Sequence, residues 1–197
     1  MKKVLFSAVA LLAFGFANAQ EESKGNGGFS KGDVFVSGAV GFGSEKTGDQ
    51  KDNSFTVAPK VGFFVTENIA VGGKLGYTSA KTDNGSSDAK NNEFSVGAFG
   101  RYYFTPANQF SLFAELGVDY MSYDNEYGFA TGKGNGFGAN LGAGLNYFVS
   151  SNFSLEAGVA ALGFDSTKPD ASGADATNTF SFGGDWTAVT FGVNYKF

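Results

Sequence analysis

The segment Gly134–Leu155, GNGFGANLGAGLNYFVSSNFSL, alternates between large apolar residues and small or polar ones. It is uncharged and long enough to cross a bilayer, but its five Gly and four Asn exclude a transmembrane helix. With a period of two, one face collects Gly and Asn and the other collects Phe137, Ala139, Leu141, Ala143, Leu145 and Tyr147. This alternation is typical of a β-strand with one apolar face.

Seven further segments show the same alternation, so the sequence predicts eight strands. They lie at 34–42, 55–63, 69–77, 94–104, 110–120, 153–161 and 189–197. The short joins between strands are 65–68, 105–109 and 149–152. The long polar joins are 43–53, 79–92, 122–133 and 165–185. Because short turns and long loops alternate, the strands are expected to form an antiparallel up-and-down meander.

The second face of these strands is rich in Gly and carries the ionisable residues. They are Lys60, Lys74, Arg101, Lys196, Glu115, Asp119 and Glu156. A soluble barrel has large apolar residues inside, whereas this pattern suits lipid outside and a crowded polar interior. A sheet spans a bilayer only if it closes, because every backbone polar group must be paired. The sequence therefore predicts an all-β, closed eight-stranded antiparallel up-and-down transmembrane β-barrel with short periplasmic turns and long extracellular loops. A secreted soluble barrel is the remaining alternative fold.

Aromatic residues gather at both ends of the predicted strands, as expected for two membrane interfaces. Those at the short-turn ends are Phe63, Phe104, Phe110, Tyr147, Phe153, Tyr195 and Phe197. Those at the long-loop ends are Tyr77, Phe94, Tyr120, Tyr123, Phe137 and Trp186.

The two termini carry features of export and assembly. A basic Met1-Lys2-Lys3 start, an apolar run 4–17 and the small-x-small sequence Ala17-Asn18-Ala19 predict a signal peptide over 1–19 and a barrel domain over 20–197. The last strand alternates apolar residues up to a terminal Phe: Phe191, Val193, Tyr195 and Phe197. This ending resembles the C-terminal signal of bacterial outer-membrane proteins that their assembly machinery reads.

Residues 28–197 as a whole resemble the small OmpA/OmpX-type barrels, often described as porin-like β-barrel domains. The resemblance implies export to the Gram-negative outer membrane, contact with outer-membrane lipids and insertion by the barrel assembly machinery. The resemblance does not extend to the soluble peptidoglycan-binding domain of full OmpA-type proteins, so we expect no wall anchoring of that kind.

The amino-acid composition excludes most catalytic mechanisms. The 197-residue chain has no Cys and no His, so it lacks nucleophilic thiols, Ser-His-Asp triads and His-ligated metals. The outer-membrane enzymes of the resembled type rely on His. Glu115 and Asp119 share a strand face, but residues at this spacing are about 13 Å apart. A net charge of −5 also argues against a nucleic-acid partner. We therefore expect a non-enzymatic protein without cofactor or metal.

Two functions remain open. Paired inward charges would plug a narrow lumen, leaving a barrel that anchors surface loops for envelope integrity, adhesion or an extracellular partner. The alternative is a narrow OmpW-like channel or transporter for small hydrophobic or polar solutes.

Overall fold

A computed structural model describes residues 27–47, 50–83, 88–127, 130–183 and 190–197. Within these ranges the strands are β1 (Val34–Thr47), β2 (Gln50–Phe64), β3 (Ile69–Asp83), β4 (Asp88–Tyr103), β5 (Phe110–Tyr127), β6 (Ala130–Phe148), β7 (Phe153–Pro169), β8 (Thr177–Phe182) and β9 (Thr190–Lys196). No helix among them is long and apolar enough to cross a membrane. The predicted signal peptide 1–19 and the predicted girdle residue Trp186 lie outside the described residues.

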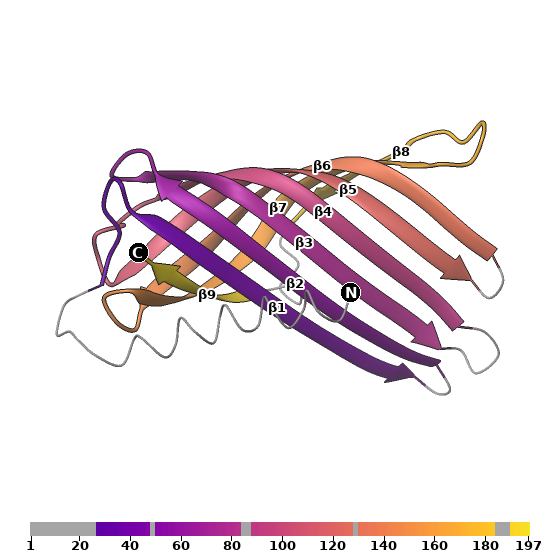
Figure 1. Cartoon of the computed structure of the whole chain (residues 1–197), viewed down its shortest axis with the longest axis horizontal. Coiled ribbons are helices and arrows are strands. Elements are labelled where there is room, and N and C mark those ends of the chain that lie inside the picture. Colours follow the sequence, from indigo (N-terminus) through magenta and orange to yellow (C-terminus); the bar gives the residue numbers. More distant parts are fainter. Residues whose placement is uncertain (1–26, 48–49, 84–87, 128–129, 184–189) are drawn as a thin grey trace.

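The sheet closes on itself. Consecutive strands from β1 to β7 pair antiparallel, and β9 lies between β7 and β1 (Figure 1). β7 pairs with β9 over Phe153–Gly158 and with β8 over Leu162–Thr167, so β8 and β9 together occupy the eighth position. The predicted closed eight-stranded up-and-down barrel is therefore confirmed. In the described chain, β1 pairs with β9 only over Phe35–Ala39, and β8 pairs with β7 alone.

Most of the polar joins that the sequence predicts as loops are strand. The ladders continue to the pairs Thr47↔Gln50, Asp83↔Asp88 and Tyr127↔Ala130. β7 likewise runs to Pro169, and β8 falls inside the predicted join 165–185. The reason is that apolar alternation marks only the lipid-facing part of a strand. Beyond the membrane both faces are polar while backbone pairing continues.

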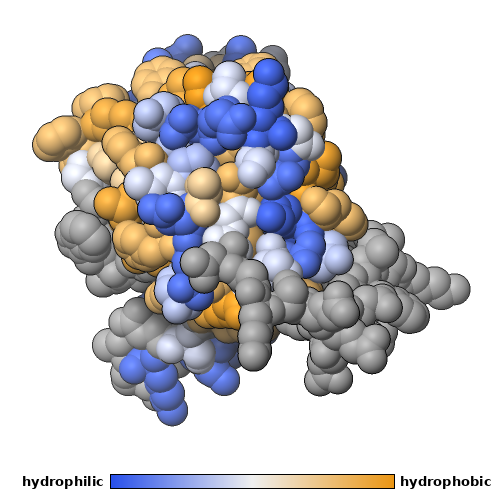
Figure 2. Space-filling view, turned by 90° about the vertical axis from the view of Figure 1, so that its left-hand side faces the viewer, coloured by the Kyte–Doolittle hydropathy of each residue, from blue (hydrophilic) through white to orange (hydrophobic). Residues whose placement is uncertain are grey.

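The arrangement of the two faces is inside-out relative to a soluble protein. Leu116 is 58% exposed, whereas the neighbouring Glu115 is 8% exposed. The end that carries the short turns shows hydrophilic residues across its middle and hydrophobic ones along its flanks (Figure 2). The predicted girdle residue Tyr123 is an exception to the sequence assignment. Its hydroxyl approaches Gly134 on the inner face of β6, so it does not face lipid.

A register shift in β7 changes which residues face the lumen. Leu141 pairs with Leu162 and Gly142 with Ala160, so Ala161 is an extra residue opposite β6. Such a bulge reverses the inside–outside alternation beyond it. Asp165, which the sequence places in a loop, therefore borders a lumen cavity.

Candidate functional site

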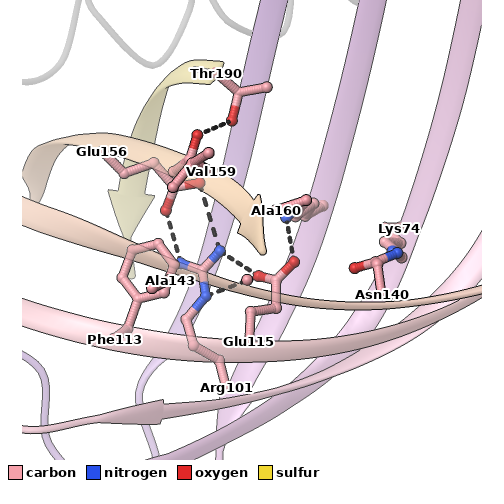
Figure 3. Close-up of a pocket in the computed structure, with 13 residues that line it drawn as sticks. Lys74, Arg101, Phe113, Glu115, Asn140, Ala143, Glu156, Val159, Ala160 and Thr190 are labelled. Atoms are coloured by element: carbon pink, nitrogen blue, oxygen red, sulfur yellow. Dashed lines mark hydrogen bonds and ion pairs between the residues drawn. The ribbon is translucent and has the colours of Figure 1, made fainter. Parts of the chain in front are cut away.

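The candidate site is the short-turn half of the lumen, where Arg101 of β4 meets carboxylates from two other strands. Arg101 Nη1 lies 2.7 Å from Glu156 Oε2 of β7, and Nε donates to Glu115 Oε2 of β5 at 2.9 Å. The Arg101 side chain is 1% exposed. One guanidinium therefore joins β4, β5 and β7, and Figure 3 shows it between the two carboxylates.

Further polar groups complete this cluster. Lys60 Nζ of β2 lies 2.7 Å from Glu115 Oε1, and the Tyr103 hydroxyl accepts a hydrogen bond from Arg101 Nη1 at 2.9 Å. Asn194 of β9 donates to Glu156 Oε2 at 3.2 Å. Two cations thus face two carboxylates. This balance is what buried charges require, because an unpaired one is strongly destabilising.

The other sequence-predicted residues lie apart from Arg101. Lys74 Nζ and Asp119 Oδ2 form a second ion pair at 2.7 Å, and Asn140 donates to Asp119 at 3.2 Å. Lys196 lies near the short-turn end, where Nζ donates to the Gly28 carbonyl and is 3.6 Å from Asp33 Oδ2. The structure thus divides the seven residues into a cluster of four, a pair and a single lysine.

An aromatic layer lies beside the Arg101 cluster and was missed by the sequence reasoning, which placed Gly, small or polar residues and ions inside. Its buried members are Phe29, Phe35, Phe64, Phe99, Tyr103, Phe113 and Phe148. Phe29 precedes β1, and its ring centroid is 4.7 Å from that of Phe64 and 4.8 Å from that of Phe148. The Arg101 guanidinium lies 3.9 Å from the Phe113 ring centroid. Such cation–π contacts stabilise a desolvated guanidinium.

A signal for most of this layer exists in the sequence. Phe99 and Tyr103 alternate in phase with Arg101, and Phe113 alternates in phase with Glu115. Strict period-two counting therefore places them inside. Phe29 precedes the first strand and has no such signal.

Glycines provide the space that these rings occupy. A Cβ on Gly144 would collide with the Phe113 ring, and one on Gly62 would collide with the Phe35 ring. Both glycines face the lumen from strands next to the ring-bearing ones. The Gly-rich inner face therefore makes room for the inward aromatic side chains.

Two polar cavities lie along the lumen. One of about 230 Å³ is bordered by Arg101, Glu115 and Glu156, and its other lining includes Val159, Ala160 and Thr190. The second, of about 320 Å³, is bordered by Glu93, Asp119 and Asp165. Lys60, Lys74 and Asn140 line both. In the described ranges, no group of three or more acidic side chains is placed to hold a metal ion.

A closed sheet with apolar residues outside and paired ions inside defines a transmembrane β-barrel. The model of the outer membrane protein β-barrel domain family matches residues 6–197, and the chain belongs to this family. Comparison with curated proteins gives no match.

Solved outer-membrane barrels share the fold. Neisserial surface protein A is 16% identical, with a TM-score of 0.51, covering 85% of this chain and 100% of that one. OprG from Pseudomonas aeruginosa is 15% identical, with a TM-score of 0.51, covering 86% and 98%. A major outer membrane protein from Thermus thermophilus is 14% identical, with a TM-score of 0.50, covering 84% and 98%. At these identities the likeness concerns the fold alone.

Proposed function

We propose that this chain is a non-enzymatic outer-membrane barrel whose lumen is closed at the periplasmic end. In this role the barrel anchors its extracellular hairpins for envelope integrity, adhesion or binding of an extracellular partner. The observation that carries the proposal is the buried Arg101 guanidinium, held by Glu115 and Glu156 next to the aromatic layer. An ionic layer and an aromatic layer then close the lumen in series.

The pairing of the carboxylates supports a role without catalysis. Glu115 is neutralised by Lys60 and Arg101, Glu156 by Arg101, and Asp119 by Lys74. A carboxylate pair that works as acid and base needs environments that hold the two groups in different protonation states, whereas Glu115 and Glu156 both face Arg101. Ion-paired carboxylates of this kind serve instead to hold strands together across the lumen.

Conductance in planar bilayers tests the closed lumen. We expect no steady single-channel steps from the wild-type barrel. Removing the Arg101 ion pairs (R101S/E115S/E156S) or two rings of the aromatic layer (F29A/F113A) alone is expected to give little conductance, because the other layer remains. The combined variant is expected to conduct. Steady steps from the wild-type protein would refute the closed lumen.

A second function, lateral passage of a small solute, is favoured by one observation. Val159, Ala160 and Thr190 line the 230 Å³ cavity at the place where β7 changes partner from β9 to β8. A solute could leave the lumen for the membrane at that place without crossing the closed end. Uptake of a hydrophobic dye into proteoliposomes, blocked by Ala160→Trp and not by Ala98→Trp on the lipid face, would support this function over simple anchoring.

We further propose that β9 carries the assembly signal through Phe191, Val193, Tyr195 and Phe197. Phe191 and Phe197 are 70% and 69% exposed, and β9 is the strand that joins β7 to β1. Deleting Phe197 is expected to slow insertion into proteoliposomes that contain the assembly machinery. Spontaneous folding into detergent should be unchanged. Equal slowing in both assays would instead indicate loss of barrel stability.

A further inference from the structure

Six lysines lie at a constant spacing from outward-facing aromatic residues near the long-loop ends of the strands, which we call the outer girdle. Each lies four residues beyond an aromatic residue, on the same outward face and toward the hairpin tips. The pairs are Phe42 and Lys46, Phe55 and Lys51, Tyr77 and Lys81, Phe94 and Lys90, Phe137 and Lys133, and Phe164 and Lys168. On β5 the corresponding residue beyond Tyr120 is Asp124, which forms an ion pair with Lys133 at 3.4 Å. We name the six lysines the lysine belt.

The spacing gives the lysine belt a defined height above the bilayer core. Strands rise about 3.3 Å per residue and tilt by about 40° in membrane barrels, so four residues correspond to about 10 Å along the membrane normal. Aromatic girdles mark the edge of the hydrocarbon region. Lysine stems can also bend back toward apolar surface. The ammonium groups therefore lie at the depth of lipid headgroups.

The pairing register shows that the lysine belt follows the membrane plane and not the sheet rows. Lys46 opposes Lys51 and Lys81 opposes Lys90, but Lys51 opposes Asp83 of β3, and Asn53 opposes Lys81. The second lysine pair is thus shifted by two residues relative to the first. The aromatic pairs Phe42↔Phe55 and Tyr77↔Phe94 are shifted by the same two residues. Tilted strands require this shift to keep residues at one height.

Each of the adjacent strands β1–β4 carries one lysine of the belt, and nearby carboxylates neutralise these four cations only in part. Four exposed lysines share the outward face of these strands with two aspartates, Asp83 and Asp88, and Lys81 is 2.7 Å from Asp88. Glu126 of the neighbouring β5 lies opposite Lys90 and adds a third carboxylate. In the described ranges, Lys81 and Lys133 are the lysine-belt members that lie in ion pairs. Like charges directly opposite on paired strands are destabilising. An external anion would relieve the Lys46–Lys51 repulsion, and it would add to Asp88 and Glu126 in relieving the Lys81–Lys90 repulsion.

The opposite face of the same hairpins has the opposite charge. Asp52 and Glu93 occupy inward positions of β2 and β4, and the described inward positions of β1–β4 beyond the girdle hold no lysine. The chain as a whole carries −5. The cationic outward face therefore stands out against an acidic protein, which points to a ligand located in the membrane and not in the lumen.

We propose that Lys46, Lys51, Lys81 and Lys90 bind the phosphate groups of outer-leaflet lipids, with Lys133 and Lys168 extending the contact around the barrel. Lipid phosphate fits because the lysine belt keeps one height relative to the aromatic girdle on six strands. A protein partner or a soluble anion would bind a local patch of lysines. Neither would require the lysines of six strands to lie at one distance from the aromatic girdle. The inference does not depend on whether the lumen is closed.

The test is titration of the folded mature chain in detergent with bis-phosphorylated lipid A, followed by native mass spectrometry. The variant K46Q/K51Q/K81Q/K90Q removes the charges, and K46R/K51R/K81R/K90R retains them. Lys31→Gln, an exposed lysine before β1, is the control for a general charge effect. Dephosphorylated lipid A separates phosphate recognition from acyl-chain contact. The shift of folded barrels on unheated gels checks folding.

A basic residue near an anionic surface contributes about fivefold in binding, so the Gln variant is expected to bind phosphorylated lipid A about 20-fold or more weakly. The Arg variant and Lys31→Gln should stay within about twofold of wild type, and wild type should prefer the phosphorylated lipid. If the quadruple Gln variant does not fold, the double variants K46Q/K51Q and K81Q/K90Q are measured separately, and each is expected to weaken binding. Equal binding of wild type and Gln variants, or no preference for the phosphorylated lipid, would overturn the proposal.

Discussion

Arg101 Nη1 of β4 lies 2.7 Å from Glu156 Oε2 of β7, so a single ion pair spans the lumen between strands that are not neighbours in the sheet. The same guanidinium also holds Glu115 of β5. This contact therefore ties the middle of the chain to its C-terminal part. Its removal should affect both the stability of the barrel and the closure of the lumen.

Arg101→Ala is expected to lower the free energy of unfolding by about 3–5 kcal/mol, because it leaves Glu156 buried without a cation. Urea unfolding in lipid vesicles measures this change. The variant R101M/E156Q, which removes one cation and one carboxylate and keeps the Lys60–Glu115 pair, should recover part of the loss. Lys81→Ala breaks the exposed pair with Asp88 and should cost no more than about 1 kcal/mol. Equal losses of unfolding free energy for Arg101→Ala and Lys81→Ala would contradict a stabilising buried ion pair at Arg101.

Phe29→Ala should lower the free energy of unfolding by about 3 kcal/mol, since the ring is fully buried among the other aromatic side chains. The same variant should admit water to the periplasmic end. Hydrogen exchange of the Tyr103 amide, measured by NMR in micelles, reports that entry. Phe42→Ala is the matched control, because Phe42 is 80% exposed to the lipid side. A larger loss of stability for Phe42→Ala would argue against the aromatic layer.

Gly144→Ala should destabilise the barrel by about 1–3 kcal/mol, because the new methyl group meets the Phe113 ring and the Ala157 carbonyl oxygen. The second change Phe113→Leu should restore part of the stability by removing the contacting edge of the ring. Gly100→Ala, where a Cβ has no neighbour within 4 Å, should change stability by less than about 0.5 kcal/mol. Failure of Phe113→Leu to compensate would show that the Ala157 carbonyl oxygen, and not the ring, limits the space at Gly144.

Much of the barrel could be predicted from the sequence because lipid imposes a strong alternation. Val96, Ala98 and Leu116 could be placed outside, and Arg101 and Glu156 inside, from period two alone. The extension of the strands into the hairpins could not be predicted, since the polar ends of the strands show no alternation of apolar residues. The bulge at Ala161 and the position of Phe29 depend on long-range packing, which no local pattern specifies.

The sequence also could not predict which ionisable side chains form ion pairs with one another. Lys60, Lys74 and Lys196 look alike as inward lysines, yet they contact Glu115, Asp119 and Asp33, respectively. The stagger between strands sets which charges meet, and that stagger follows from the register of the whole barrel. Residue types and faces were therefore accessible from the sequence, whereas the pairs were not.

Leu116→Arg should cost about 2–4 kcal/mol in the free energy of unfolding in a bilayer, because its outward side chain lies near the middle of the β5 span. Leu112→Arg, on the same face but four residues closer to the periplasmic turn, should cost about 0–1 kcal/mol. Denaturant titration in vesicles measures both. An equal cost at the two depths would be inconsistent with a membrane-spanning β5.

Side-resolved cysteine labelling tests the closed lumen most directly, and the absence of native Cys makes each introduced thiol unique. Ser95→Cys borders the 320 Å³ cavity, and Ser154→Cys lies buried near the Asn194 and Glu156 contacts. With the barrel oriented in liposomes, a membrane-impermeant maleimide should label Ser95→Cys from the extracellular side only and Ser154→Cys from neither side. Labelling of Ser95→Cys at equal rates from both sides would mean a continuous water path and would contradict the account.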